Sequence, residues 1–383
     1  MRRRTILSAA AALVLFLTTC RAPDGSPDLL VSADEIALIT LHGPWPGPAI
    51  RDASNRVSGS PDAIELGRRM FFDRRLSSSG TIACATCHRP DAGWSDGLPR
   101  SRGLARLDRN SLSLYNVGGN RWFGWDGRTD SLWAHSIGPV LDPREMGADP
   151  SHVLRLLASD LSLATLYGAV FGQPVEAGDA QTVLVNLAKA LAAFQETIVS
   201  GRTAFDDFRD ALARGDRNAA ARYPKSAQRG AALFVGRGKC NLCHVGPAFT
   251  NGEFADAGVP YFIEPGRVDA GRQGGIAKLK ASPFNLAGRF NDDTRRSGAW
   301  AVQQVAEQPA NFGAFKVPTL RNLTRTAPYL HDGSRATLED VVRHYSDLDV
   351  ERLHADGERI LEPFKFTREE SDDLVAFLKT LSD

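Results

Sequence analysis

The pattern Cys-x-x-Cys-His occurs twice in the chain, at Cys84, Cys87 and His88 and again at Cys240, Cys243 and His244. Two thiols at this spacing can each form a thioether bond to one vinyl group of a haem, and the adjacent histidine can bind the iron. A single Cys-x-x-Cys pair is also typical of a redox dithiol or of half a zinc site. Two copies that both carry the histidine predict two covalently bound haem c groups, with His88 and His244 as iron ligands.

The first twenty residues are typical of an export signal. Residues 2–4 are arginines, and residues 6–17 form an apolar run that is short for a membrane span. The run ends before Cys20, in a sequence that resembles a lipobox except that Thr19 stands where glycine or alanine is usual. Lipidation of Cys20 and simple cleavage therefore both remain open. Either outcome predicts the periplasm of a Gram-negative bacterium, with a lipid anchor as the only contact with a membrane.

The composition argues against several classes of function. The chain has 383 residues, with 46 Lys and Arg against 45 Asp and Glu, so its formal net charge is +1. This balance predicts no broad basic surface, and we expect no nucleic-acid partner. The length suits one large domain or two medium ones.

The surroundings of the two haem motifs are similar. Residues 66–72 and 229–234 each suggest a short helix with a glycine at its front and an aromatic residue at its end. After the motifs, residues 93–97 and 248–252 share the order aromatic, hydroxyl residue, Asp or Asn, Gly. The repetition predicts a tandem duplication of a small haem domain. The expected fold class is mainly α, with two cytochrome c-like haem domains in tandem and long irregular loops.

The expected organisation follows from local patterns. Residues 180–200 carry apolar side chains at helical spacing and predict a core helix. Residues 264–282 are rich in glycine and lack periodicity, so we expect a long loop. The predicted units are a signal peptide (1–20), an N-terminal extension (21–60), a first haem domain (61–213), a polar linker (214–225) and a second haem domain (226–383).

Further motifs follow each other in a specific order around the two haem motifs. Together with them, this order resembles the bacterial dihaem cytochrome c peroxidase and MauG superfamily, from about residue 60 to the C-terminus. The residues that carry the resemblance are W-D-G-R at 125–128, G-P-V at 138–140, E-M-G at 145–147, F-K-V-P-T-L-R-N at 315–322 and A-P-Y-L-H-D-G at 327–333.

The resemblance implies roles around the first haem, which is the peroxide-reacting one in this family. His88 is the implied proximal ligand, Glu145 the distal acid–base group, and Pro139 a residue that lines the distal pocket. His135 stands where these enzymes usually carry Gln; it could hydrogen-bond bound water or peroxide, or it could ligate the iron. Trp125 is the implied relay between the haems.

Many family members cap the resting first iron with a histidine from the loop that follows the first motif. No histidine lies between His88 and His135 in this chain. We therefore expect an open sixth position without reductive activation.

The second haem should carry His244 and one further ligand. Peroxidases of the family use methionine there, but the three methionines of this chain lie at positions 1, 70 and 146. Spacing from His331 points to Tyr345. Thr337 begins a predicted helix whose apolar face contains Tyr345 and not His344. A tyrosinate ligand should lower the reduction potential and favour a high-valent iron, as in MauG.

A calcium ion between the domains is also usual in the family. By motif, Asn116 would supply a side-chain oxygen, and Thr326 and Pro328 would supply backbone carbonyls, which are donors that suit this cation. No motif surrounds the remaining histidines, which we expect at the surface: His42, His152 and His354.

The resemblance implies an enzyme that reacts with hydrogen peroxide at the first haem to form a bis-Fe(IV)-like state. This enzyme would then oxidise a side chain, a tryptophan, of a partner protein. Gly238 stands where MauG has a surface tryptophan, and residues 282–289 look more like the MbnH-like branch. The alternatives are a peroxidase fed by a small cytochrome or cupredoxin and a dihaem electron carrier without catalysis.

Overall fold

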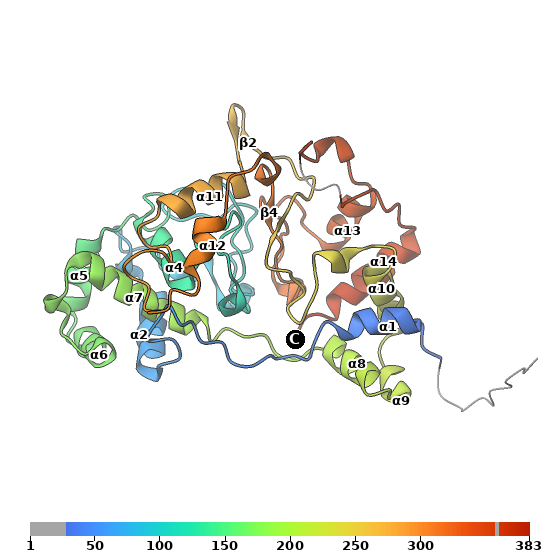
Figure 1. Ribbon diagram of the computed structural model, residues 1–383, viewed down its shortest axis with the longest axis horizontal. Helices are drawn as coiled ribbons and strands as arrows, with labels where there is room; N and C mark the ends of the chain where they lie inside the picture. The colour runs from blue at the N-terminus through green and yellow to red at the C-terminus, as the bar shows by residue number, and fades with distance from the viewer. Residues whose placement is uncertain (1–27, 357–359) are drawn as a thin grey trace, which may run out of the picture.

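The computed structural model describes residues 28–356 and 360–383. Within these residues the chain is mainly helical, which confirms the predicted fold class at this level, and it forms two lobes that lie side by side (Figure 1). The predicted export signal and Cys20 lie outside the described residues.

The first lobe is built around a long central helix. This helix, α7 (Ala180–Gln195), confirms the predicted core helix, and thirteen of its sixteen residues are buried. Asp179 caps its start by accepting a hydrogen bond from the Thr182 amide (3.0 Å). The other helices of this lobe are α2 (Pro61–Phe72), α3 (Cys84–Cys87), α4 (Leu132–Leu141), α5 (Pro150–Ser159) and α6 (Leu161–Phe171).

The second lobe has its own hydrophobic core. Phe205, Phe234, Phe249 and Phe377 meet there in a cluster of edge-on and tilted aromatic contacts. The helices of this lobe are α1 (Ala33–Thr40), α8 (Ala204–Ala213), α9 (Arg217–Ala220), α10 (Lys225–Val235), α13 (Leu338–Ser346) and α14 (Arg368–Lys379).

The helices α8 and α9 and the segment between them belong to the second core. Phe208 of α8 stacks on Tyr223 at 4.2 Å between ring centroids, and Ala220 of α9 is buried. The predicted bounds assign α8 to the first haem domain and α9 to a linker. In the structure both pack with the second haem motif, because their apolar faces match its core.

A glycine allows a close helix crossing in each lobe. A Cβ at Gly67 of α2 would lie 2.0 Å from the carbonyl oxygen of Ala190 in α7. A Cβ at Gly230 of α10 would lie 2.0 Å from the carbonyl oxygen of Asp373 in α14. No real side chain tolerates such a distance, so the backbones of each pair touch only because glycine is present. The same device in both lobes supports the predicted duplication.

The segment expected as a loop contains a hairpin strand and a helix, so that prediction is wrong. The helix, α11 (Arg272–Ala281), contains Gly274 and Gly275, which obscured its periodicity. A Cβ at Gly275 would lie 1.9 Å from the carbonyl oxygen of Asp126, so the glycine serves close packing. The helix that follows is α12 (Ala299–Gln304). Both helices lie against the first lobe, although they come from the second half of the chain (Figure 1).

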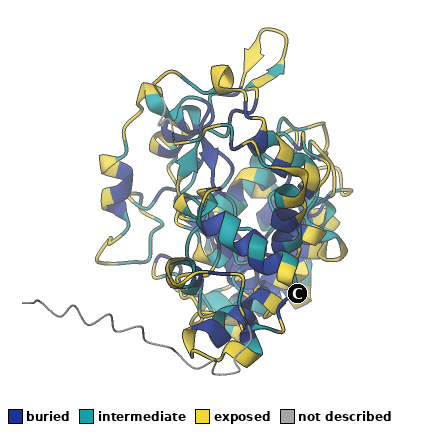
Figure 2. Cartoon of the chain, turned by 90° about the vertical axis from the view of Figure 1, so that its right-hand side faces the viewer, coloured by how far each residue is buried: buried dark blue, intermediate teal, exposed yellow. Residues whose placement is uncertain are grey.

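Strands are short and lie in two-stranded pairs. β1 (Phe254–Ala255) pairs antiparallel with β4 (Phe315–Lys316), and β2 (Phe262–Glu264) pairs with β3 (Arg267–Val268). The β2–β3 hairpin stands out from the body and is mostly exposed (Figure 2). The 3-10 helices are η1 (Arg74–Leu76), η2 (Pro90–Ala92), η3 (Val117–Gly119), η4 (Val175–Ala177), η5 (Cys240–Leu242), η6 (Pro309–Asn311), η7 (Leu323–Arg325) and η8 (Val350–Arg352).

Among the described residues, no single helix has the length and apolar character needed to cross a membrane. By length and composition alone, α5 and α6 pass the same test as a pair, but the pair is bent by 107°.

The glycine crossings can be tested by adding one methyl group. Gly67→Ala and Gly230→Ala should each cost at least about 2 kcal/mol, because a backbone carbonyl cannot move aside. The midpoint of thermal unfolding should then fall by about 4–8 °C. Gly168→Ala on α6 is the control: its Cβ would meet only one atom, at 3.9 Å, and it should gain about 0.5–1 kcal/mol. Equal midpoints for all three variants would contradict the close crossings.

Candidate active site

A cavity of about 1050 Å³ is lined by residues of both lobes, and both haem motifs face it. Its size lies at the upper end of the range for ligand sites in proteins. Every residue that the sequence singled out for haem, catalysis or calcium lines this one cavity: Cys84, Cys87, His88, Asn116, Trp125, His135, Pro139, Glu145, Cys240, Cys243, His244, Thr326, Pro328 and Tyr345.

Each motif histidine is oriented by one backbone carbonyl. Nδ1 of His88 lies 3.1 Å from the Trp94 carbonyl, and Nδ1 of His244 lies 3.0 Å from the Phe249 carbonyl. A carbonyl only accepts, so Nδ1 carries the proton and Nε2 keeps its lone pair for a metal. Trp94 and Phe249 both adopt left-handed backbone conformations (φ 58° and 53°) that turn these carbonyls toward the rings.

The residues present fit two haem c groups. The four motif cysteines meet the cavity beside the histidines. In both motifs the histidine amide donates to the carbonyl of the first cysteine at 2.9 Å, so the two turns have the same local form. Aromatic and aliphatic side chains from both lobes line the remaining wall, as a large apolar ring requires.

His135 and Pro139 lie one turn apart on α4. Nδ1 of His135 hydrogen-bonds the hydroxyl of Thr129 (3.0 Å), and its ring stacks on Phe123. Burial, followed by the charge of Arg128, lowers the pKa of His135 to about 4. The imidazole is therefore neutral at pH 7.

Glu145 lies in the turn after α4 and is held by its backbone. Its carbonyl accepts a hydrogen bond from the Leu104 amide (3.0 Å), and its amide donates to the Asp142 carbonyl (3.0 Å). Gly103 lets this loop approach, because a Cβ there would lie 2.6 Å from the Glu145 Cα. Burial, and then the charge of Asp142, raises the pKa of the Glu145 carboxyl. A carboxyl whose pKa is raised in this way is a better proton acceptor once it is ionised.

Tyr345 and Pro139 occupy corresponding places in the two lobes. Tyr345 lies on α13, eight residues after its N-cap Thr337, and Pro139 lies on α4, eight residues after its N-cap Ser131. The predicted capping box at Thr337 is confirmed. His344 instead hydrogen-bonds the Ala257 carbonyl (2.7 Å). Of these two neighbours only Tyr345 lines the cavity, together with the apolar α13 residues Leu338, Val341 and Val342.

Trp125 is fixed where the lobes meet. Its Nε1 donates to the Asn110 carbonyl (2.9 Å), and its own carbonyl accepts from the Lys316 amide (2.8 Å). Next to it, the fully buried Asp126 pairs with Arg109 (2.8 Å). Arg109 also forms two 2.6 Å hydrogen bonds to Asp269 from the second half of the chain.

Sequence reasoning missed the charges beside Trp125. Asp126 lies inside the quoted W-D-G-R motif, whereas no local signal distinguishes Arg109 or Asp269 from surface charges.

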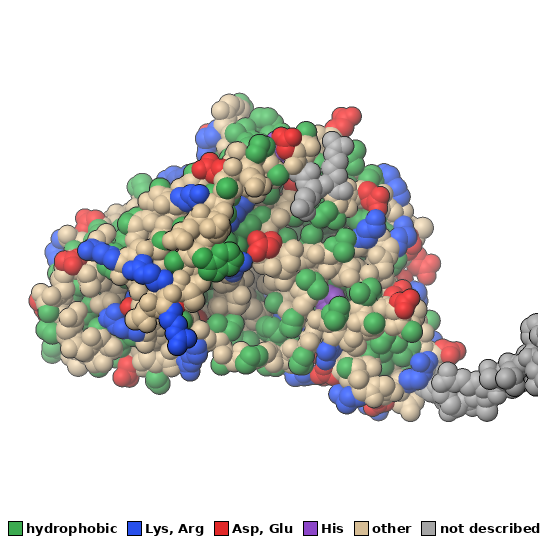
Figure 3. Space-filling model, in the orientation of Figure 1, with side chains coloured by type: hydrophobic (Ala, Val, Ile, Leu, Met, Phe, Trp, Pro, Cys, Tyr) green, Lys and Arg blue, Asp and Glu red, His purple; other side chains and the backbone are tan. Residues whose placement is uncertain are grey.

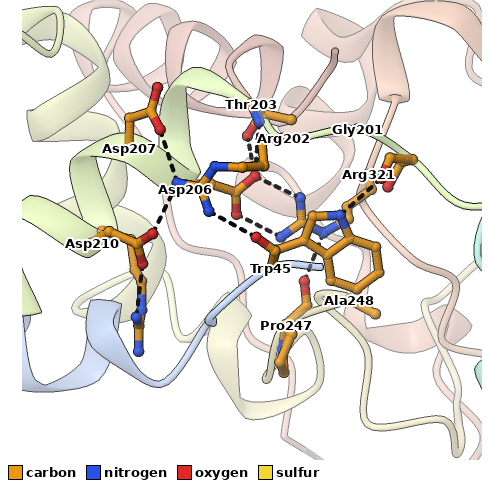
Figure 4. A network of polar contacts seen from close by, with 12 residues as sticks. Trp45, Gly201, Arg202, Thr203, Asp206, Asp207, Asp210, Pro247, Ala248 and Arg321 are labelled. Carbon is orange, nitrogen blue, oxygen red and sulfur yellow. Dashed lines mark hydrogen bonds and ion pairs between the residues drawn. The ribbon is translucent and has the colours of Figure 1, made fainter. Parts of the chain in front are cut away.

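A second charged pair, also missed, supports the second haem motif (Figure 4). Arg321 is buried; it forms two hydrogen bonds to Asp206 (2.8 and 3.0 Å) and one to the Pro247 carbonyl (2.7 Å). Trp45 covers its guanidinium at 4.1 Å. His42, expected at the surface, is also buried here, and its Nε2 lies 3.1 Å from the His244 carbonyl. It is buried because the N-terminal extension packs behind the motif, which no local pattern indicates.

Calcium at the place that the resemblance implies stays a prediction. The side-chain oxygen of Asn116 already accepts from the Ser200 amide (2.9 Å) and lies 3.3 Å from the Ser200 hydroxyl. These contacts use both lone pairs of that oxygen. No group of three or more His, Cys, Asp or Glu side chains suited to a metal ion occurs among the described residues.

Two helical lobes, each presenting a Cys-x-x-Cys-His motif to a shared cavity, define a dihaem c-type cytochrome. A model of the di-haem cytochrome c peroxidase family matches residues 61–214. The methylamine utilization protein MauG of Methylorubrum extorquens is 36% identical over 95% of this chain and 90% of its own length. The chain belongs to the di-haem cytochrome c peroxidase and MauG family of haem-dependent oxidoreductases, which confirms the resemblance.

Other relatives include proteins named as peroxidases and proteins named as MauG-like. The cytochrome-c peroxidase IdrP2 of Pseudomonas sp. strain SCT is 33% identical over 85% of this chain and 82% of its own length. Among solved structures, a MauG-like protein associated with microbial copper homeostasis matches with a TM-score of 0.66 and 26% identity, covering 89% of this chain and 95% of that one. The family therefore includes both MauG proteins and peroxidases.

The buried pair beneath the second motif can be tested by one substitution. Asp206→Asn leaves the Arg321 guanidinium buried without a charge partner, which should cost about 3–5 kcal/mol. The thermal midpoint should fall by at least roughly 6 °C. Asp207→Asn, one residue on, removes an exposed pair with Arg202 and should change stability by less than about 0.5 kcal/mol. Similar losses in both variants would refute a special role for the buried pair.

Proposed function

We propose that this chain is a MauG-like dihaem enzyme that reacts with hydrogen peroxide and oxidises a side chain, a tryptophan, of a partner protein. The observation that carries the proposal is Tyr345, which faces the cavity beside the second motif where a peroxidase of the family would place methionine. The MauG relative at 36% identity and the MauG-like structural neighbour support the same branch.

When bound, the two haems would supply the redox chemistry: reaction with peroxide at the first and storage of oxidising equivalents over both. The residues of the chain would accept, donate and transfer protons. The Glu145 carboxylate would accept the proton of one peroxide oxygen and return it to the departing oxygen. His135, neutral at pH 7, can donate one hydrogen bond and accept another, as a bound peroxide or water requires.

The asymmetry between the lobes supports different roles for the two haems. Pro139 carries no donor atom in its side chain, so it would leave the first haem open to peroxide. Burial raises the pKa of the Tyr345 phenol; at the corresponding place this oxygen would lose its proton to bind the second iron, and as an anion it would stabilise oxidised iron. Trp125, held between the lobes by two hydrogen bonds, would carry charge from one haem to the other.

A peroxidase fed by a small cytochrome or cupredoxin is the second candidate. The relatives named cytochrome-c peroxidase favour it. It requires sustained turnover with a reduced donor, whereas a MauG-like enzyme should turn over such a donor slowly.

We place the protein in the periplasm. This proposal rests on the apolar N-terminal run, and lipidation at Cys20 would add a membrane anchor.

The role of Glu145 predicts a pH profile. Only the carboxylate can accept a proton, and its pKa is raised by burial and by Asp142. The rate of reaction with peroxide should therefore fall as the pH drops through this raised pKa. Glu145→Gln should lower the rate by a factor of about 10²–10⁴ and should remove the fall of the rate at low pH. Asp142→Asn should move this fall to lower pH, because loss of the negative neighbour lowers the pKa of Glu145. Stopped-flow mixing with peroxide measures both, and an unchanged Glu145→Gln rate would exclude the role.

The ligand role of Tyr345 predicts a spectral change. Tyr345→Phe should alter the absorption and electron paramagnetic resonance spectra of the second haem and leave those of the first unchanged. Tyr329→Phe is the matched control, since Tyr329 also lines the cavity but donates its hydroxyl to the Leu323 carbonyl (2.8 Å). If Tyr345→Phe behaves like the control, the proposed function loses its main support.

The same resonance experiment on the resting protein tests the function directly. A high-spin and a low-spin signal, both lost after one equivalent of peroxide, would support it. Two low-spin signals that do not change when peroxide is added would instead support a simple electron carrier.

A further inference from the structure

One tryptophan is placed differently from all the others. All six tryptophans lie in the described residues, and only Trp300, on α12, is exposed, at 58%. Exposed tryptophan is costly in water and is enriched at the centres of protein interfaces. Among the described residues, the Arg121 guanidinium lies over its ring (5.3 Å), and more than half of the residue stays exposed.

A continuous stack of side chains connects Trp300 with the cavity. The guanidinium of Arg121 lies over the rings of both Trp300 (5.3 Å) and Trp122 (5.1 Å). On the inner side, Arg272 lies over Trp122 (4.5 Å) and Phe254 (4.1 Å). Arg121 and Phe254 both line the haem cavity. An aromatic route therefore runs from the protein surface to the cavity wall.

The charges along this route decide where a positive charge would reside. Trp122 is buried and faces two cations, Arg121 and Arg272, so loss of an electron from its indole is electrostatically opposed. Trp300 faces one cation and is open to water, which stabilises charge. Trp122 should thus act as a short-lived bridge and Trp300 as the terminal position.

The surface near Trp300 carries unpaired positive charge. Lys280 follows Leu279 of α11, which packs against α12. Figure 3 shows Lys and Arg side chains on this lobe, close to hydrophobic side chains over α12. Four exposed cations of this segment form no ion pair with any other described residue: Lys280, Arg289, Arg295 and Arg296.

We propose that Trp300 and these four cations form the docking surface for an acidic partner protein, and that electrons from the partner enter the chain at Trp300. The inference rests on the proposed function, because it needs haems that peroxide has oxidised. Each peroxide takes two electrons and two protons and leaves as two waters. A donor group of the partner then loses an electron, which the haems gain through the stack, and no bond forms or breaks in the relay.

The docking surface can be tested by binding alone. The probe is plastocyanin, a small acidic copper protein, titrated into the dihaem holoprotein at low ionic strength. Lys280→Glu should weaken binding by roughly tenfold, because it places a negative charge against an acidic surface. Lys225→Glu is the matched control, with the same charge change at an exposed lysine of α10 in the other lobe. Added salt should weaken wild-type binding. Equal binding by the two variants would overturn the docking surface.

The entry point is tested by electron transfer. After peroxide treatment, Trp300→Ala should accept electrons from reduced plastocyanin at least about tenfold more slowly than wild type, as expected for an interface centre. Phe262→Ala is the control, since Phe262 is also exposed (63%) but lies on the β2–β3 hairpin. Equal rates for both variants would overturn entry at Trp300. Spectral change on adding peroxide to the wild-type protein alone tests the proposed function separately, so the two failures are distinguishable.

Discussion

The close approach of two helix backbones at a glycine is the constraint on which each lobe depends. At Gly67 and at Gly230 there is no room for even one methyl group. The crossing brings the helix that precedes each haem motif against the longest helix of its lobe, α7 in the first and α14 in the second. From there the chain runs into the Cys-x-x-Cys-His turn, and a left-handed residue turns one carbonyl toward the histidine. Local geometry of this kind aims both Nε2 atoms at one cavity.

Buried charge then joins segments that lie far apart in the chain. Arg109 bridges Asp126 of the first lobe and Asp269 of the second half of the chain; both carboxylates are buried and Arg109 is largely covered. Removing one member would leave a buried charge unpaired, which costs far more than a surface ion pair contributes. The arrangement also fixes Trp125, which lies next to Asp126 and between the lobes. The segment with α11 and α12 is held on the first lobe by the Arg109–Asp269 contact and by apolar packing against Trp122.

Much of the site could be predicted from the sequence because its signals are local. The haem motifs, the capping box at Thr337 and the inward face of α13 each depend on residues a few positions apart. The helix α11 was missed because Gly274 and Gly275 suggest a loop, and their packing role involves a distant backbone. His42 and Arg109 were missed for a related reason. Their partners lie some 200 and 160 residues away in the chain, and no short-range pattern encodes such contacts.

One difference between the repeated halves places different side chains at corresponding positions of the two lobes. Both lobes use the same capped helix, and both place a residue eight positions after the cap beside the histidine's cavity. Proline at that place has no donor atom and lacks an amide proton, so it leaves the region open. Tyrosine at the same place offers an oxygen that an iron can bind. A duplicated scaffold with this one exchange therefore presents a side chain without a donor atom in one lobe and a phenol in the other, and Trp125 lies at their junction.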